Sequence, residues 1–154
     1  MINSSKLDNH TIKVLEKSGW CKDRRIDISN WIEQLKSEGY KNSPYASEIL
    51  EEFGGLNISP ERIKTGKIYP GDIDFNALDA GSGEFDRMEI FEPIAGESLF
   101  PLGMVFGQWF LYVGLSNKIY MGSTVKLYIL GESIEEFLNN IILGIQEPLE
   151  LKKI

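Results

Sequence analysis

The sequence predicts an α+β fold in which short N-terminal helices precede a mainly antiparallel set of strands and a C-terminal helix. The first third of the chain carries apolar residues at helical spacing. Residues 102–130 instead form four β-rich runs, whose connections are too short for crossover helices. With 154 residues, of which 42% are hydrophobic, the chain is expected to form a single domain, residues 1–154, around a packed core.

Two short helices are expected before residue 40. The first covers Thr11 to Lys17 and ends at Gly19. Asp27 or Ser29 can cap the second, which Gly39 ends. Its apolar face is formed at i, i+3, i+4 and i+7 by Ile28, Trp31, Ile32 and Leu35. The tryptophans of this region are therefore expected in the core.

The third helix is the most completely specified element. Ser43 can accept the free N–H groups of the first turn, and Pro44 suits the first helical position. One apolar stripe is formed by Ile49, Leu50 and Phe53. Gly54 and Gly55 can adopt the left-handed conformation that ends a helix, and Leu56 can pack back on the last turn.

The middle of the chain gives weaker signals. Residues 67–69 and 73–75 are short strand candidates. The glycines of residues 81–83 indicate a turn, because the lysine and serine or threonine of a phosphate-binding loop do not follow them. Residues 84–91 then have apolar side chains at three-residue spacing, which predicts a short acidic helix that Pro93 stops.

The last part of the chain is predicted as an antiparallel meander and a helix. The four β-rich runs are residues 104–106, 109–113, 118–121 and 125–130. Ser133-Ile134-Glu135-Glu136 is a capping box that opens the final helix, with Gly144 past its end. The apolar residues of this helix are Phe137, Leu138, Ile141 and Ile142. The tail, residues 146–154, is expected to be loosely attached.

Charge is concentrated in one segment. The net charge is −7, and the segment from Asp72 to Glu97 contains one base, Arg87. Its acids are Asp72, Asp74, Asp79, Glu84, Asp86, Glu89, Glu92 and Glu97. Such a surface repels nucleic acid and anionic membranes and attracts basic partners, so we expect no binding to either of the first two. A solvated face that serves solubility alone is the other interpretation.

Composition and the N-terminus point to the cytoplasm. The single cysteine, Cys21, cannot form an internal disulfide, so nothing indicates an oxidising compartment. The first residues are polar and lack an apolar signal segment, and no apolar run is long enough to span a membrane.

The residues give little support for an enzyme or a cofactor site. A Cys–His pair would have to combine Cys21 with His10, and no local signature supports it, so Cys21 is expected to be a partly buried structural thiol beside Trp20. Asp72 and Asp74 should both face outward from a strand. With Asp79 or Glu84 they could bind a divalent cation, but the spacing of a calcium loop is missing. We expect no cofactor, no metal and no catalytic residue.

Taken together, an ordered set of motifs resembles the third subgroup of the SUKH superfamily, whose bacterial members are immunity proteins of polymorphic toxin systems. The resemblance covers most of the chain. It rests on Val14-Leu15-Glu16-Lys17-Ser18-Gly19-Trp20, Arg24-Arg25, Trp31, Glu38-Gly39-Tyr40, Leu50-Glu51-Glu52-Phe53-Gly54-Gly55-Leu56, Leu99-Phe100-Pro101-Leu102-Gly103, Lys118-Ile119-Tyr120, Gly131-Glu132-Ser133 and Leu143-Gly144. Cys21 departs from it, since a bulky residue is usual after the tryptophan. The resemblance implies a curved, mainly antiparallel sheet covered by helices.

The resemblance also implies a function: binding of a toxin domain, often a nuclease, made by the same cell. We expect the motif residues to determine the fold rather than to contact the toxin. These are Gly19, Trp20, Trp31, Gly39, Phe53, Gly54, Gly55, Leu56, Pro101, Gly103 and Gly131. From charge alone, the toxin-facing residues are expected to be Asp72, Asp74, Asp79, Glu84, Asp86 and Glu89, with Tyr69 as an aromatic anchor. The alternatives are a non-catalytic adaptor of the same fold and, third, a metal-binding protein or enzyme.

Overall fold

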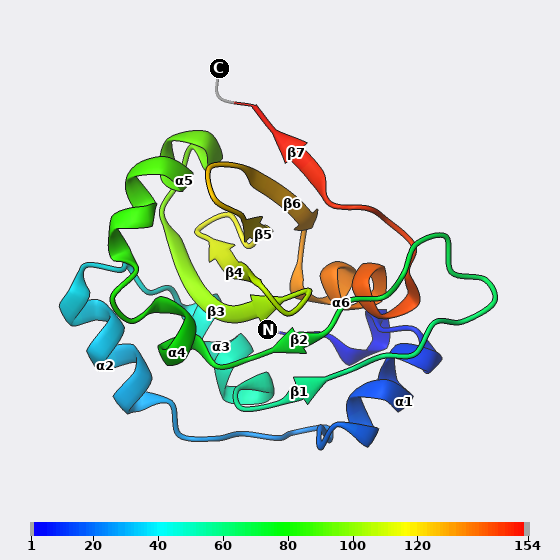
Figure 1. Ribbon diagram of the computed structural model, residues 1–154. Coiled ribbons are helices and arrows are strands. Elements are labelled where there is room, and N and C mark those ends of the chain that lie inside the picture. Colours follow the sequence, from blue (N-terminus) through cyan, green and yellow to red (C-terminus); the bar gives the residue numbers. More distant parts are fainter. Residues whose placement is uncertain (1, 153–154) are drawn as a thin grey trace.

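The computed structural model describes residues 2–152 and shows an α+β fold (Figure 1). Over that range a curved, seven-stranded antiparallel sheet runs in the order β1 to β7, each strand pairing with the next along the chain. The strands are β1 (Asn57–Ile58), β2 (Ile73–Asp74), β3 (Leu99–Val105), β4 (Trp109–Gly114), β5 (Ile119–Gly122), β6 (Leu127–Gly131) and β7 (Leu149–Leu151). The predicted antiparallel meander is therefore confirmed.

The helices flank this sheet (Figure 1). They are α1 (Asn9–Lys17), α2 (Ser29–Glu38), α3 (Pro44–Phe53), α4 (Ala77–Gly81), α5 (Met88–Ala95) and α6 (Ile134–Leu143), with the 3-10 turns η1 (Ser4–Lys6) and η2 (Phe85–Arg87). The N-terminal helices are spread around the sheet, with α1 against α6 and α2 against α4. The predicted caps are present on α3 and α6. Ser43 accepts the N–H of Ala46, and Ser133 accepts the N–H of Glu136.

The central strands are covered on both faces. Successive side chains of a strand point to opposite faces. In β4 the ring of Tyr112 lies 5.8 Å from that of Phe91 on α5, while Leu111 and Val113, which point the other way, are also buried. Strands buried on both faces read as nearly continuous apolar runs, and this explains why residues 99–105 and 109–113 lack a clean alternation.

The turn from Phe53 to Leu56, here called the FGGL turn, connects the helical layer to the sheet. Arg24 donates to the carbonyl oxygens of Glu52 and Gly54, at 2.6 and 2.9 Å, and so satisfies carbonyls left free at the end of α3. Gly55 then donates its N–H to the carbonyl of Phe75, just after β2. The last turn of α3 is thereby linked to both the N-terminal segment and the sheet.

The two glycines of the FGGL turn have different roles. Gly55 has a φ of +82°, the left-handed conformation that was expected for both. Gly54 does not adopt it, because its φ is −53°. A Cβ on Gly54 would lie 2.3 Å from the carbonyl oxygen of Leu50 and 3.0 Å from the Ile26 side chain. Gly54 is needed for close packing, and Gly55 for backbone conformation.

The segment between β1 and β2 corrects one strand prediction. Residues 67–69 are not a strand, although their apolar and aromatic side chains predicted one. The N–H groups of Lys67 and Ile68 instead donate to the carbonyl of Gly144, at 2.7 and 3.0 Å, past the end of α6. Strand β2 pairs with β3 and with β1, and the sequence did not reveal β1 because two residues are too few to show a period.

In the acidic segment, the predicted end of one helix was wrong and another short helix was not predicted. Pro93 was expected to stop the helix, but α5 continues to Ala95. The lost hydrogen bond would have gone to the carbonyl of Glu89, and because both residues are exposed, water can solvate that carbonyl. No helix was predicted between β2 and the turn at residues 81–83, but α4 occupies Ala77–Gly81.

The tail is more ordered than expected over part of its length. Strand β7 pairs with β6, with Leu149 opposite Ile129 and Leu151 opposite Leu127. Glu150 accepts from Lys152 at 2.8 Å and lies 3.7 Å from Lys126. Residues 153–154 of the predicted loose tail lie outside the described residues.

Alanine substitutions at the two glycines should separate packing from backbone strain. Gly55→Ala meets no atom within 4 Å but must hold a positive φ, so it should cost about 1 kcal/mol of unfolding free energy. Gly54→Ala forces atoms of α3 and the N-terminal segment apart and should cost about 3 kcal/mol. Urea denaturation measures both values. Equal losses at the two positions would contradict the different roles.

A second prediction concerns Glu52, whose carboxylate accepts the Nε1–H of Trp20 at 2.9 Å. Burial raises the pKa of Glu52, so the folded protein binds this proton more tightly than the unfolded chain, and the stability gained at low pH is lost as the pH rises. Glu52→Gln keeps an oxygen acceptor for Trp20 and removes the titration. Its unfolding free energy relative to the unmodified protein should increase above about pH 4, where an unfolded glutamate ionises, and level off above the raised pKa.

Urea denaturation over a pH series measures that difference. Glu16→Gln, on the exposed side of α1 and away from Trp20, is the matched control for loss of one glutamate charge. A difference for Glu52→Gln that stays constant across the series would contradict the prediction.

Candidate functional site

The acidic segment follows one side of the molecule through β2, α4, η2 and the start of α5, drawn in green in Figure 1. Two close contacts hold these elements on the sheet. A Cβ on Gly103 of β3 would lie 1.8 Å from the carbonyl oxygen of Asp74, and one on Gly81 would lie 2.5 Å from Pro101. Because Gly103 and Gly81 have no side chains, β2 and α4 can approach β3 closely. These contacts fix the backbone that carries the acids.

Asp72 and Asp74 lie on the same side of β2, as the alternation of a strand predicted. Ile73 and Phe75 point to the core and are almost fully buried, while Asp72 is exposed and Asp74 half-buried. Burial raises the pKa of Asp74, and the negative charge of Asp79 raises it further. Both aspartates face a shallow groove of about 240 Å³, lined by Asn57, Ile58, Ser59, Asp72, Ile73, Asp74, Met104 and Gly107.

Asp79 lies in the first turn of α4, where a carboxylate is favourable. The Asn76 side chain caps this helix by accepting the N–H of Asp79 at 3.1 Å, and its amide donates to the Asp79 carboxylate at 3.0 Å. Asn76 therefore fixes Asp79 close enough to Asp74 for the two charges to interact.

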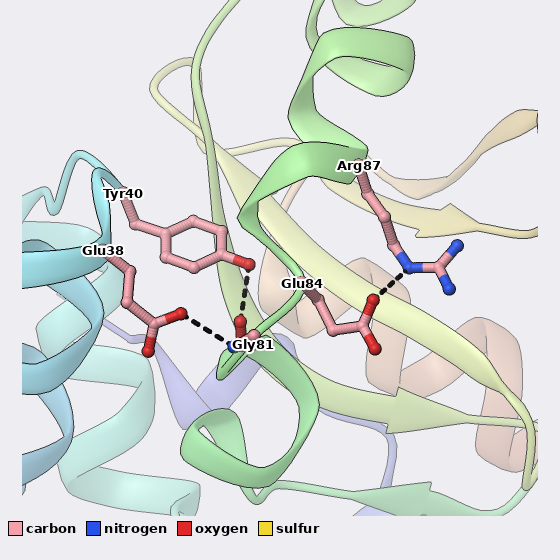
Figure 2. A network of polar contacts seen from close by, with 6 residues as sticks. Glu38, Tyr40, Gly81, Glu84 and Arg87 are labelled. Atoms are coloured by element: carbon pink, nitrogen blue, oxygen red, sulfur yellow. Dashed lines mark hydrogen bonds and ion pairs between the residues drawn. The ribbon is translucent and has the colours of Figure 1, made fainter.

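A second group of acids surrounds Tyr40 (Figure 2). Glu84 accepts from Nε of Arg87 at 2.6 Å, and the Arg87 guanidinium stacks on the ring of Phe110 at 4.5 Å. Arg87, the one base of the segment, is thus directed to Glu84. The other carboxylates of the segment have no basic partner within it. The hydroxyl of Tyr40 donates to the carbonyl of Gly81 at 2.8 Å, which ties α2 to the end of α4.

Glu38 belongs to this group, although the sequence did not place it there. It lies at the end of α2 and accepts the N–H of Gly83 at 2.8 Å (Figure 2). Hydrogen bonds from Gln34 and Gly83 hold the pKa of Glu38 below its usual value, so it is ionised at neutral pH. The motif Glu38-Gly39-Tyr40 marked Glu38 in the sequence. Its contact with Gly83 could not be predicted, because the two residues are 45 positions apart.

The acids of the segment divide into two classes. Glu92 accepts the N–H of Leu99 at 2.9 Å, and Glu97 accepts from Ser116 and from the hydroxyl of Tyr120, so both serve the fold. The carboxylates of Asp72, Asp86 and Glu89 make no hydrogen bond or ion pair with any residue from 2 to 152. We call Glu38 and the six predicted acids the acidic surface: Glu38, Asp72, Asp74, Asp79, Glu84, Asp86 and Glu89.

Tyr69 lies apart from the acidic surface in its contacts. It is 72% exposed, as an anchor should be, and the Arg62 guanidinium stacks on its ring at 4.2 Å. It belongs to the loop between β1 and β2, whose basic residues are Arg62, Lys64 and Lys67. Tyr69 therefore presents an aromatic ring beside positive rather than negative charge.

The structure also bears on the expectations about metal and thiol chemistry. Cys21 is exposed, whereas a partly buried thiol was expected, because only the Trp20 side chain turns into the core, where it stacks on Phe53. Within residues 2–152, no group of three His, Cys, Asp or Glu side chains could hold a metal ion. None of the helices in that range is long and apolar enough to cross a membrane.

The sequence of the chain matches a described protein family. A family described as SUKH-3 immunity protein matches residues 7–144, which leaves out only the first six and the last ten residues of the chain. Neither the curated proteins nor the solved structures gave a match. Because the family match covers far more than half of the sequence, the chain belongs to the SUKH-3 immunity protein family.

Proposed function

We propose that this immunity protein neutralises a cognate toxin of a bacterial polymorphic toxin system by direct stoichiometric binding in the cytoplasm, without catalysis and without a cofactor. We further propose that the toxin is a nuclease with a basic active site. The observation that carries the proposal is the acidic surface on a member of an immunity family. Its acids come from the end of α2 and from the stretch that runs through β2, α4, η2 and the start of α5, and the one base of that stretch, Arg87, is directed to Glu84.

The physical argument is charge competition. A nuclease must attract phosphate, so its active site tends to be basic, and a protein with a concentrated negative surface can occupy that site as a competing polyanion. Charges of this kind mainly increase the rate of association and select the partner. The same field repels nucleic acid, so we propose that the protein binds the toxin and not the toxin's substrate.

Within the acidic surface, the residues divide into free and fixed charges. Asp72, Asp86 and Glu89 are exposed and are proposed to attract lysine or arginine side chains of the toxin. Asp74, Asp79, Glu84 and Glu38 are held by their environment and hydrogen bonds, so they would offer fixed negative charge at low entropic cost. Tyr69, which lies outside the acidic surface, is proposed as an aromatic anchor because its exposed ring can bury apolar area against the toxin.

Reversal of charge on β2 tests the acidic surface. The double variant Asp72→Lys/Asp74→Lys is expected to associate about tenfold more slowly with the toxin at low salt, because steering depends on the local field, and its association rate should depend less on salt. Stopped-flow or biosensor kinetics at several salt concentrations measure both effects. Thermal unfolding checks that this double variant and its control are folded.

The matched control is Glu16→Lys/Glu136→Lys, which changes the net charge equally at two exposed positions on α1 and α6. It should associate at nearly the unmodified rate. If the two double variants slow association equally, the effect comes from net charge and the acidic surface is not the toxin-facing side.

Co-expression tests the immunity function itself. The protein should co-purify in a one-to-one complex with the toxin encoded beside it, restore growth of cells that express this toxin, and block cleavage of nucleic acid by the purified toxin. An adaptor of the same fold would give no rescue. Rescue together with a toxin that leaves RNA and DNA intact would contradict the nuclease proposal while supporting neutralisation.

A further inference from the structure

A second surface lies on the other side of α2 from α4. It is an open groove of about 580 Å³ between α2 and α3, which we call the isoleucine groove. Its lining is Ile26, Asp27, Ile28, Ser29, Ile32, Glu33, Lys36, Ser47 and Glu51. Three isoleucines form an apolar floor, and most of the charged residues around them are acidic.

Helix α2 packs on α4 with its other side. Leu35 is the fully buried residue of α2, and a Cβ on Gly81 of α4 would lie 2.8 Å from its side chain. Ile32 is only half-buried. The segment before α2 is fixed at the bottom of the groove, since Ile26 donates its N–H to the carbonyl of Glu51 at 2.9 Å. This hydrogen bond attaches the segment to α3, and the side chains of Ile26 and Ile32 are left half-buried while Ile28 is buried.

The lining residues of the groove extend along α2 for about two helical turns. Ser29, Ile32 with Glu33, and Lys36 recur at i, i+3, i+4 and i+7, which is about two turns or roughly 10 Å along α2. Ser47 and Glu51 supply the opposite wall at i and i+4 on α3. A groove between two helices accepts an amphipathic helix through apolar side chains at the same spacing.

The charges select a basic occupant. Hydrogen bonds from Ser29 hold the pKa of Asp27 below its usual value, so this carboxylate is ionised, and Glu33 is exposed beside it. Glu51 is partly compensated by Arg25, 3.6 Å away. Lys36 is the one base of the lining. A lysine or arginine beside the apolar stripe of a docked helix would meet Asp27 and Glu33.

We infer that the isoleucine groove is a docking site for an amphipathic helix of the partner protein, whose apolar stripe is flanked by lysine or arginine. The inference rests on the proposed function, because the basic character of the partner comes from that proposal. The inference adds a separate contact with an apolar component, since the acidic surface provides mainly charge. The toxin would then be held at two places, on either side of α2.

A defined peptide tests the groove without the toxin. The probe is a 14-residue peptide with leucines at helical spacing and lysines on the flanks, titrated into the ¹⁵N-labelled protein. Amide shift changes are expected within residues 26–36 and 47–51. An isomer of the same composition with the leucines spread around the helix should bind at least about fivefold more weakly, the factor that roughly 1 kcal/mol of lost apolar contact gives.

Two variants with matched controls locate the site. Ile32→Ala removes part of the floor and Glu33→Lys reverses the rim, and each should weaken the peptide about fivefold. Ile12→Ala alters an isoleucine of α1 that is also half-buried, and Glu16→Lys makes the same charge change on α1, so neither should affect binding. Thermal unfolding of all four variants shows whether Ile32→Ala acts through stability, and Glu33→Lys, at an exposed position, tests the groove independently of folding.

Shift changes centred on residues 72–89, equal binding of the isomer, or no binding at about 1 mM peptide would each overturn the inference. A neutralisation assay with the toxin distinguishes this inference from the proposed function. If Ile32→Ala and Glu33→Lys neutralise the toxin as strongly as the unmodified protein, the groove is not a toxin contact, and neutralisation through the acidic surface stands. Weaker neutralisation by both variants, with the α1 controls unchanged, supports docking in the groove.

Discussion

The end of α3 is the constraint on which the other parts of the structure depend. Arg24 binds the carbonyls of Glu52 and Gly54, so the segment before α2 is attached to the last turn of α3. Gly55 then pairs with Phe75, so the same turn is attached to the sheet. Gly54 has no side chain, which lets Ile26 and Trp31 pack against the turn. Without this junction, neither β2, which carries the first acids, nor the floor of the isoleucine groove would have a fixed position.

The distribution of acids follows from what the core can accept. A carboxylate inside the fold needs hydrogen bonds that replace water. Glu97 has them from Ser116 and Tyr120, and Glu92 from the backbone of Leu99. The remaining acids lie where β2, α4 and α5 meet solvent, and their mutual repulsion is relieved at one point, by Arg87. The negative charge that remains on this side of the molecule is the feature that the proposed basic partner would neutralise.

Helix α2 connects the two candidate surfaces. At its end, Glu38 binds the backbone of Gly83 and joins the acidic surface, and at its middle Glu33 lines the isoleucine groove. Glu33 also lines a polar groove with Leu78 and Ser82, between α2 and α4. The exposed residues of α2 thus lie between the isoleucine groove and the acidic surface. In the proposed contact with the toxin, the acidic surface would supply electrostatic attraction and the isoleucine groove the apolar area that lasting contacts require.

The sequence by itself determined the α+β class, the antiparallel meander, the caps of α3 and α6 and the outward direction of Asp72 and Asp74, because each depends on neighbours within a few residues. It also identified the family. Only the tertiary structure decided that residues 67–69 bind the end of α6, that part of the tail pairs with β6, that Gly54 is required by packing, and that Glu38 joins the acids. These features join residues far apart in the chain, and no local periodicity or propensity records which distant backbone group will satisfy a given hydrogen bond.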